Sequence, residues 1–476
     1  MQTPCSQSGD ADRICVFIVN WNRKDDLEKL LASLYEALAL FRDKQPGLPV
    51  DIVVLDNAST DGSVDLLEER HPNVAIVRNA VNTGGAGGFA QGMEYARDHG
   101  YSYLWILDND VVLVGDPLTP LLDVMRRETG AGLVGSCILH KDNPDFVSEA
   151  GARIGWNSYP KPVCMNVKRS ACGESRVFDV DYVAACSALI RVEVIEYCGV
   201  FDRDYFLMWD DMDWGYRIKR RGFGVYATTA SMVIHPGFSE RMPSLFLEYY
   251  ARRNHMRFVS RNYRGLRKLA LLAYLNAIVA ARIAKLSFLG RPDIVQALKY
   301  AREDFWNNAF GQRRDLHNGG ARRGGVALLP FEEIDWEGAS KVHVMPNFPV
   351  PLLRKMLGAL PKGARVEIHA TRKHFPFIDS AFPDYHCKIL GGMRPYRDIL
   401  KEKDSIVLLP AWVIPPILIA QNGGTYAVDE NMRARRLRGR SLPMGAARKL
   451  LRGLVYLGAA GRGFGYTFFR QPRRMT

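Results

Sequence analysis

The sequence lacks the cysteine pattern of a disulfide scaffold and the leader of a secreted protein. Its eight cysteines are scattered through 476 residues, with no CxxC pair and no dense framework. We therefore expect reduced, cytosolic cysteines. The first residues carry no basic stretch followed by an apolar run, so no signal peptide is expected. The chemistry of the protein is expected to face the cytoplasm.

Two long segments lack acidic residues. Tyr249–Pro292 holds ten lysines or arginines and residues 431–476 hold twelve, with no Asp or Glu in either. The formal charge of +13 is therefore concentrated in these segments. Such segments suit anionic lipid, a pyrophosphate-bearing acceptor or nucleic acid. Ordinary solvated helix faces would usually include acidic partners. No DNA- or RNA-binding module accompanies the basic residues, so nucleic acid is not an expected partner.

Long apolar runs are scarce as well. Residues 269–289 form the only one, and it contains Arg282 and Lys285, which are costly at bilayer depth. We expect a helix that packs on the catalytic domain or lies in the membrane interface, and not a span.

What is present is an alternation of strand-like and helix-like segments, which predicts a doubly wound, mainly parallel α/β sheet flanked by helices. The expected strands of the first half are residues 14–19, 51–55, 74–77 and 103–107. A fresh α/β pattern follows, with expected strands at 342–345, 366–369, 387–390 and 406–409 and a helix at 351–360. The length predicts two or three domains. Their expected bounds are a catalytic domain at 1–245, a basic helical segment at 246–325, a small α/β domain of unknown role at 326–430 and a basic amphipathic tail at 431–476.

The strand at Tyr103–Leu107 is apolar throughout, as expected for burial on both faces of a parallel sheet. Asp108 and Asp110 follow at its carboxyl end, the edge at which α/β sheets bind ligands. Two carboxylates at this spacing can share one Mg²⁺ or Mn²⁺ ion, and polar turn residues are the alternative. His235 ends a later strand-like run, and its imidazole would complete an oxygen-rich divalent site.

A second acidic cluster, Asp210, Asp211 and Asp213, lies between Trp209 and Trp214. Three carboxylates this close repel one another, and their burial is unfavourable without a cation or hydrogen bonds. The start of a helix explains one of them through the helix dipole. It does not explain three.

The stretch NTGGAGGF at Asn82–Phe89 has four glycines in five residues. Glycines allow close approach of a ligand to the backbone and leave N–H groups free at a helix start, and a flexible turn is the alternative. The stretch fits neither a Walker loop nor the GxGxxG pattern.

The order of these motifs resembles the family-2 glycosyltransferases with a GT-A fold, in particular bacterial galactofuranosyl- and rhamnosyltransferases. The resemblance covers about Ile14 to Asn262 and rests on Asn20-Trp21-Asn22, the turn at 56–63, the loop at 82–88, Asp108-Asn109-Asp110, the cluster at 209–214 and the segment at 249–254. The Gln-x-x-Arg-Trp motif of processive members is absent.

The resemblance implies a role for each motif. Asp211 would be the catalytic base and Asp210 would position the acceptor. Asp108, Asp110 and His235 would hold Mn²⁺ or Mg²⁺. The donor-binding residues would be Asn20, Asp56, Asn82, Gly84, Gly85 and Asp108. The acceptor-binding residues would be Trp209, Asp213 and Trp214.

The expected function is that of an inverting, metal-dependent glycosyltransferase. Its donor would be a UDP- or dTDP-sugar, with galactofuranose or rhamnose favoured, and its acceptor a lipid-linked or cell-surface glycan. The alternatives are a nucleotidyltransferase that forms sugar nucleotides and a non-catalytic sugar-nucleotide-binding protein. A nucleotidyltransferase would need a Gly-rich, basic loop after the first strand, and Asn20-Trp21-Asn22 is not one. A homo-oligomer is left open.

The tail is expected to associate with the inner face of the cell membrane. Plotted as a helix, Met444–Ala459 has leucines on one side and basic residues on the other, and five arginines precede it between Arg433 and Arg440. Docking on the protein's own core is the alternative.

His369, His374 and His386 fit no standard metal spacing, and we expect surface histidines there.

Overall fold

The structure is a computed structural model that describes residues 12–236, 245–288 and 291–316 and parts of 329–436. The chain divides into two compact units. The first is drawn from residues 1–153, 161–279 and 293–321, and the second from residues 154–160, 280–292 and 322–476. Each unit is described separately.

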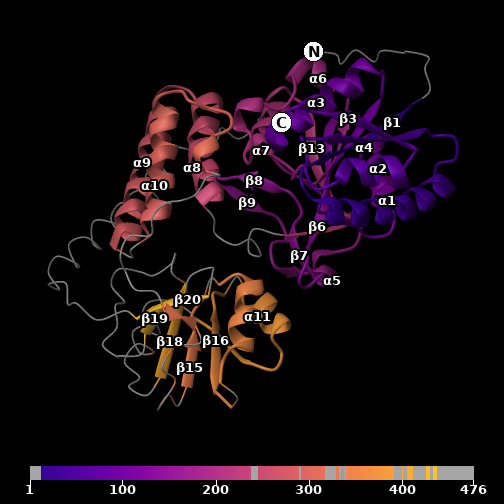
Figure 1. The fold of residues 1–476 in the computed structure, drawn as a ribbon. Coiled ribbons are helices and arrows are strands. Elements are labelled where there is room, and N and C mark those ends of the chain that lie inside the picture. Colours follow the sequence, from indigo (N-terminus) through magenta and orange to yellow (C-terminus); the bar gives the residue numbers. More distant parts are fainter. Residues whose placement is uncertain are drawn as a thin grey trace, which may run out of the picture. The chain divides into compact units, whose positions relative to one another are not determined.

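An 11-stranded sheet forms the centre of the first unit (Figure 1). Its strands are β1 (Ile14–Asn20), β2 (Val50–Asp56), β3 (Val74–Arg78), β4 (Tyr103–Asp108), β5 (Val112–Leu113), β6 (Ala131–His140), β7 (Phe146–Glu149), β10 (Val167–Lys168), β11 (Val177–Asp179), β12 (Ser187–Arg191) and β13 (Gly224–His235). A separate two-stranded ribbon joins β8 (Ala152–Ile154) to β9 (Pro160–Pro162).

The order of the strands is that of a doubly wound sheet with mixed edges. β4, β1, β2 and β3 are parallel neighbours in this order. β12 pairs antiparallel with both β4 and β6, and β6 pairs in parallel with β13. After β1 the chain adds β2 and β3 on one side of β1, and it then adds β4 on the other side. The order in which strands are added therefore reverses between β1 and β4, although these two strands are parallel. Ligands bind at such a reversal in open α/β sheets.

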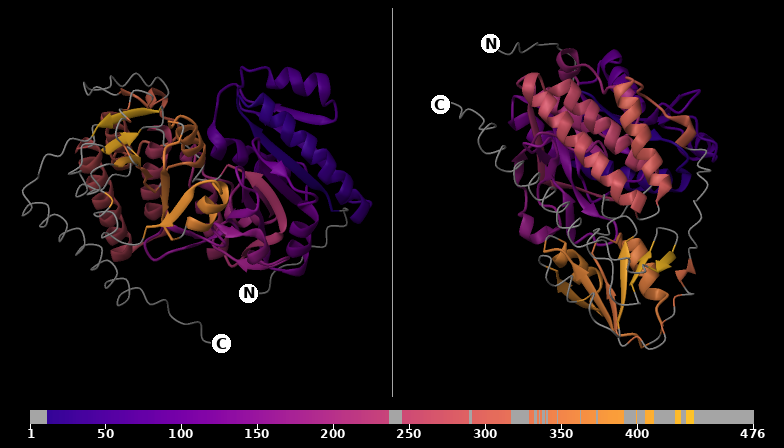
Figure 2. Two further views of the ribbon diagram at one scale, coloured as in Figure 1. Left: turned by 90° about the horizontal axis from the view of Figure 1, so that it is seen from below. Right: turned by 90° about the vertical axis from the view of Figure 1, so that its left-hand side faces the viewer.

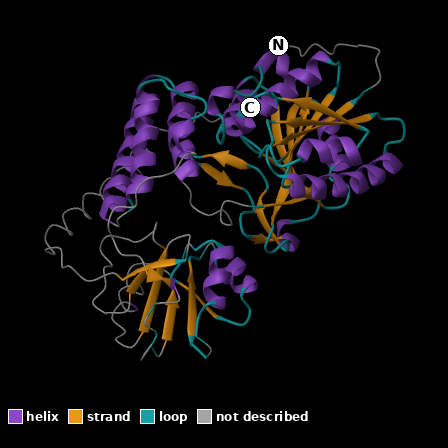
Figure 3. Cartoon of the chain, in the orientation of Figure 1, coloured by secondary structure: helices purple, strands orange, loops and turns teal. Residues whose placement is uncertain are grey.

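Helices cover both faces of this sheet (Figure 3). The helices that precede the second sheet in the chain are α1 (Lys24–Lys44), α2 (Ser63–Arg70), α3 (Gly84–Asp98), α4 (Leu118–Arg127), α5 (Arg169–Cys172), α6 (Val194–Cys198), α7 (Asp210–Arg220), α8 (Leu245–Asn262), α9 (Gly265–Phe288) and α10 (Pro292–Trp306), with short 3₁₀ turns η1 (Arg203–Tyr205) and η2 (Arg314–Leu316). One core packs α1 and α4 against alternate residues of β1 such as Val16, and the other packs α3 and α7 against residues such as Phe17. The predicted fold class is therefore confirmed.

Three long helices, α8, α9 and α10, follow the sheet and lie side by side (Figures 1 and 2). α9 covers the long apolar run, and the prediction of a helix there is confirmed. Of the helices that the structure describes, none combines the length and the apolar character needed to span a bilayer.

The second unit has its own seven-stranded sheet. Its elements are β14 (Leu329–Pro330), β15 (Lys341–Val344), α11 (Val350–Gly358), β16 (Val366–Ala370), α12 (Phe375–Ala381), β17 (His386–Ile389), β18 (Ser405–Pro410), β19 (Thr425–Val428) and β20 (Arg433–Arg436). The four strands and the helix predicted there are confirmed. β20 pairs antiparallel with β19 and β14, so Arg433–Arg436 belong to this sheet although they fall within the predicted tail. The rest of the tail lies outside the described residues.

The expectation of surface histidines is wrong for His369. Its side chain is buried on β16, where its Nε2 lies 2.9 Å from the Nδ1 of buried His343. Glu367 lies beside both rings, and its Oε1 accepts hydrogen bonds from Lys341 and Lys388. The parallel pairing of β15 and β16 brings His343 alongside Glu367. Spacing along the chain could not predict this pairing, and so it could not predict the contact of His343 with His369. Two ammonium groups therefore neutralise the charge of this carboxylate. His374 is half-buried and His386 is exposed.

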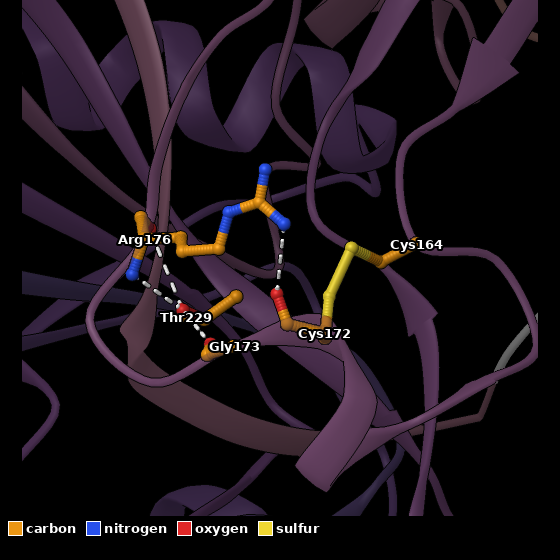
Figure 4. Close-up of a disulfide and its surroundings, with 5 residues drawn as sticks. All are labelled: Cys164, Cys172, Gly173, Arg176 and Thr229. Atoms are coloured by element: carbon orange, nitrogen blue, oxygen red, sulfur yellow. Dashed lines mark hydrogen bonds between the residues drawn. A yellow bond between two sulfur atoms is a disulfide. The ribbon is translucent and has the colours of Figure 1, made fainter.

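The expectation that all cysteines are reduced is also wrong. Cys164 and Cys172 form a disulfide that spans eight residues (Figure 4). The chain after it is tied to β13, because the Oγ1 of Thr229 donates to the carbonyl of Gly173 (2.7 Å) and accepts from the backbone N–H of Arg176 (2.8 Å). The pairing could not be predicted because the turn-rich segment 149–176 does not show from its sequence that the two Cα atoms lie 6.1 Å apart. The other cysteines of the described residues are free.

Candidate active site

Three polar residues meet at the carboxyl ends of neighbouring parallel strands. Asn20 ends β1 and pairs in register with Asp56, the last residue of β2, while Val19 pairs with Asp108, the last residue of β4. The Nδ2 of Asn109 donates to the Oδ1 of Asn20 (2.8 Å), which joins the turn after β4 to the end of β1. The sheet therefore brings Asn20, Asp56 and Asp108 to one edge, as the sequence predicted.

The two carboxylate oxygens of Asp56 differ in their hydrogen bonds. Its Oδ2 accepts the backbone N–H of Ser59 (3.0 Å), which closes the turn after β2. Its Oδ1 is buried and has no hydrogen-bond partner among the described residues. An unpaired buried carboxylate oxygen costs free energy, so it is a candidate for a bond to a ligand hydroxyl or amide.

The glycine-rich stretch starts α3, but its glycines serve packing. Gly84 has a φ of +75°, and a Cβ on it would lie 2.1 Å from the carbonyl oxygen of Phe206. The N–H of Gly84 bonds to the Oδ1 of Asn82 (2.8 Å), and the N–H of Ala86 bonds to the carbonyl of Phe206 (3.2 Å). The predicted free N–H groups at this helix start are therefore not found at Gly84 and Ala86. The loop holds the 206–209 segment in place instead.

Asn57, which the sequence analysis missed, organises this loop. Its Nδ2 donates to Asn82 Oδ1 and to the Gly84 carbonyl, and its Oδ1 accepts from Asn79 and from the backbone and hydroxyl of Thr83. It is 1% exposed. The Oδ1 of Asn82 is occupied by these protein contacts, so the predicted binding of a donor would have to use its Nδ2 group.

The predicted metal ligands come together. The Nε2 of His235 lies 3.1 Å from the Oδ1 of Asp110 and 3.6 Å from the Oδ2 of Asp108. One donor atom from each residue falls within 4.8 Å of the other two. The antiparallel pairing of β5 with the end of β13 causes this, because Val112 lies opposite Ile234. The set of two carboxylates and one imidazole suits Mn²⁺ or Mg²⁺ with further oxygen ligands.

Asp210 and Asp211 begin α7, immediately after a strained loop. Phe206, Met208 and Trp209 all have positive φ values, between 62° and 73°. Such values are unfavourable for non-glycine residues and are kept only where surrounding contacts impose them. The Oδ1 of Asp211 accepts the N–H of Met212 (2.7 Å), and its Oδ2 accepts the N–H of Ala185 (3.4 Å).

Arg253 and Asn254 of α8 impose this loop conformation. Asn254 Nδ2 donates to the carbonyls of Tyr205, Leu207 and Met208, at 2.7 to 3.0 Å. The fully buried guanidinium of Arg253 donates to the carbonyls of Tyr205, Asp204 and Gly311. The Tyr-Tyr-Ala-Arg-Arg-Asn segment thus sets the position of Asp211, a role that the sequence analysis did not assign.

The carboxylates of this region raise one another's pKa. Burial, with a contribution from the charge of Asp108, raises the pKa of Asp211 to about 6. Burial and the charge of Asp211 raise the pKa of Asp210 well above its usual range. Burial and the Asp211 charge also raise the pKa of Glu149 to about 7, and Tyr182 donates a long hydrogen bond to it (3.4 Å). Asp108, Asp210, Asp211 and Glu149 therefore share one electrostatic environment, which a cation would relieve.

The three residues predicted to bind the acceptor all have contacts within the protein. Asp213 is fully buried and accepts hydrogen bonds from Arg217, Tyr205 and Asn262. Trp214 is 1% exposed and donates to the Gly199 carbonyl in the core. Trp209 is 5% exposed and stacks on His255 with ring centroids 4.0 Å apart. Residues of α8 enclose Trp209 and Asp213, and the core beneath α7 encloses Trp214. Their predicted role in acceptor binding stays a prediction.

The sheet and the carboxylates at its edge are those expected of a GT-A-type glycosyltransferase. Residues 15–195 match the family model described as glycosyl transferase family 2. The chain therefore carries a family-2 glycosyltransferase domain and is a glycosyltransferase.

Named relatives agree with this assignment. N-acetylglucosaminyl-diphospho-decaprenol L-rhamnosyltransferase of Mycobacterium tuberculosis is 27% identical over 250 residues, which is 48% of this chain and 78% of that protein. Galactofuranosyltransferase GlfT1 of Mycolicibacterium smegmatis is 24% identical over 243 residues, which is 49% of this chain and 74% of that protein. Among solved structures, the mannosyltransferase PcManGT from Pyrobaculum calidifontis matches with a TM-score of 0.40 at 17% identity, over 63% of this chain and 88% of that one.

Proposed function

We propose that this chain is an inverting, divalent-metal-dependent glycosyltransferase that moves a sugar from a nucleoside diphosphate to a lipid-linked glycan. One observation carries the proposal. A carboxylate–imidazole cluster at the end of β4 lies within electrostatic reach of Asp211, a carboxylate whose pKa is raised to about 6. A cation site and a general base side by side are what such a displacement requires.

The residues present fit a divalent cation. Asp108, Asp110 and His235 offer three donor atoms on one side. Burial and neighbouring carboxylates raise the pKa values of Asp211 and Glu149, so a cation bound nearby would stabilise their charged forms. A cation bound there would act as a Lewis acid on the diphosphate of the donor. The unpaired Oδ1 of Asp56 would bind the ribose or base of the nucleotide.

Asp211 would take the proton of the acceptor hydroxyl. Attack by that oxygen on the anomeric carbon, from the face opposite the leaving diphosphate, inverts the configuration in a single step. The backbone N–H groups of Met212 and Ala185 hold both oxygens of Asp211, so the base is oriented before the acceptor arrives.

The relatives suggest the donor and acceptor classes. A rhamnosyltransferase and galactofuranosyltransferases resemble this chain, which favours a dTDP- or UDP-linked rhamnose or galactofuranose as donor. The diphospho-decaprenol named for the rhamnosyltransferase favours a polyprenyl diphosphate acceptor.

A screen of nucleotide sugars tests this function. We expect hydrolysis or transfer of one UDP- or dTDP-sugar in the presence of Mn²⁺ or Mg²⁺ and at least about 100-fold less after chelation, since the ion stabilises the leaving group by several kcal/mol. Product formation is followed by chromatography, and the anomeric configuration of the product by NMR. A retained configuration, or equal rates with and without chelator, would contradict the proposed mechanism.

We further propose that the basic tail anchors the protein to anionic membrane at the inner face. Because Arg433–Arg436 form β20, the tail can be removed without damage to the second sheet only after Arg436. A chain that ends at Arg436 is expected to co-sediment less with anionic liposomes than the full chain, by about tenfold or more, because each basic residue near the bilayer contributes about 1 kcal/mol. Donor hydrolysis should be unchanged. Equal co-sedimentation of both chains would contradict the proposed membrane anchor.

A further inference from the structure

Five arginines surround a pocket of about 460 Å³ at the C-terminal ends of α7 and α8, in the first unit. They are Arg217, Arg220, Arg221, Arg261 and Arg264. Five guanidinium groups around one pocket repel one another unless anions neutralise them.

Only some of these arginines have hydrogen-bond or ion-pair partners within the fold. Arg217 donates to Asp213 (2.8 Å), and Arg261 lies 3.2 Å from Asp202. Arg220 donates to the carbonyl of Asn262 at the end of α8 (2.8 Å), which is an ordinary helix C-terminal contact. Arg221 and Arg264 are exposed, and within the described residues neither has a carboxylate partner. The pocket thus keeps a surplus of positive charge.

Apolar side chains stand out of the surface beside this pocket. Arg261 also lines a second pocket of about 790 Å³, together with Lys268, Leu269 and Trp306. Leu266 is 85% exposed, Leu269 63% and Trp306 59%. Leu266 and Leu269 are the two most exposed large apolar residues that the structure describes. They lie in the first turn of α9, next to Arg264.

We propose that this helix corner, defined by Arg221, Arg264, Leu266, Leu269 and Trp306, docks on an anionic membrane surface. The arginine pocket would take the phosphate of a lipid headgroup, and the leucines and the tryptophan would enter the headgroup boundary. Basic and apolar residues that are exposed side by side are the pattern of interfacial membrane binding. Charge complementarity selects an anionic bilayer over a neutral one.

The position of the corner agrees with the proposed lipid-linked acceptor, on which this inference rests. α7 begins with Asp210 and Asp211 and ends at the arginine pocket. Eleven helical residues span roughly 16 Å. Docking at the corner would therefore hold Asp211 about one helix length from the headgroup layer, where the diphosphate and first sugar of a polyprenyl acceptor emerge.

Vesicle co-sedimentation of the full chain tests the corner. The double variant Arg221→Glu/Arg264→Glu is expected to bind phosphatidylcholine vesicles that contain phosphatidylglycerol at least about tenfold more weakly than the unaltered chain at low salt. The double variant Leu266→Ser/Leu269→Ser should also bind more weakly, and the remaining binding should be lost at high salt, because only its electrostatic part is left.

Matched variants make the result specific. Arg42→Glu/Lys161→Glu changes the net charge equally at exposed sites away from the corner, and Leu40→Ser/Val81→Ser removes two exposed apolar side chains of α1 and of the loop after β3. Both should bind like the unaltered chain, and thermal melts confirm folding of all four. Unchanged binding of the corner variants, or equal loss in the matched variants, overturns the docking surface. Donor hydrolysis reports separately on the proposed function, and we expect all four variants to keep it.

Discussion

The Asp110→Asn variant is expected to lose Mn²⁺-dependent binding of the nucleoside diphosphate. The change keeps the size of the side chain but removes one of the two carboxylate charges beside His235. Even a change in the groups that orient metal ligands costs 10- to 100-fold in metal affinity, so loss of a ligand charge should cost about 100-fold or more. Calorimetric titration of UDP and dTDP, with and without Mn²⁺, measures the effect.

The control for this variant is Asp123→Asn, which removes one negative charge from an exposed position on α4. It should bind the diphosphate like the unaltered chain, which separates the ligand effect from a general change of charge. The same Mn²⁺-dependent affinity in Asp110→Asn and in the unaltered chain would show that the cation is held elsewhere.

The meeting of polar residues at this sheet edge could be predicted because they lie at or just after the ends of strands. An apolar run predicts a buried strand, and parallel strands present their carboxyl ends at one edge, so Asp56 and Asp108 had to meet there. His235 was predicted by the same reasoning from the end of a later strand. In these cases local pattern and sheet topology fix the position of a side chain without knowledge of its distant neighbours.

The contacts of Asp213, Trp214 and Glu149 could not be predicted in that way. Asp213 accepts a hydrogen bond from Asn262, and Trp214 donates one to the carbonyl of Gly199. No sequence pattern near residue 213 indicates either contact. Glu149 was missed because it ends β7 in a segment without periodicity. Its nearness to Asp211 comes from the fold alone.

The loop before α7 shows a similar division. Its sequence gives no reason for three positive φ values, and the cause lies in Arg253 and Asn254 some 45 residues later. The motif that contains them was recognised by resemblance. Its purpose became clear only from its hydrogen bonds to the 204–208 carbonyls.

The Asp211→Asn variant is expected to keep its affinity for the donor and to lose turnover by about 10² to 10⁴ fold, the usual contribution of a positioned base. Asparagine can still accept the N–H of Met212 (2.7 Å) through its one amide oxygen and loses only the long bond from the N–H of Ala185 (3.4 Å), so the loop should stay in place. Steady-state rates and donor titrations on the same preparation separate turnover from binding.

Asp213→Asn is the matched control within the same helix. Its carboxylate binds Arg217, so this variant should lose about 1–3 kcal/mol of stability, while each folded molecule keeps its turnover. Asp211→Asn should behave in the opposite way. Folding raises the pKa of Asp211 to about 6, so ionisation of this carboxylate destabilises the fold as pH rises toward and through 6. Removal of its charge should therefore raise the Tm of the metal-free protein at pH 7.

The pH dependence gives the last and sharpest check on Asp211. A protonated carboxyl cannot take the acceptor proton, so turnover of the unaltered chain should fall toward acid pH. The midpoint should lie at or below about 6, because a bound cation would lower the raised pKa of Asp211. The residual turnover of Asp211→Asn should not show that fall, because the group that titrates has been removed. An unaltered acid limb in the variant would assign the limb, and with it the role of base, to another carboxylate of the cluster. Glu149 would be the first to examine, because its pKa is raised to about 7 in the same environment.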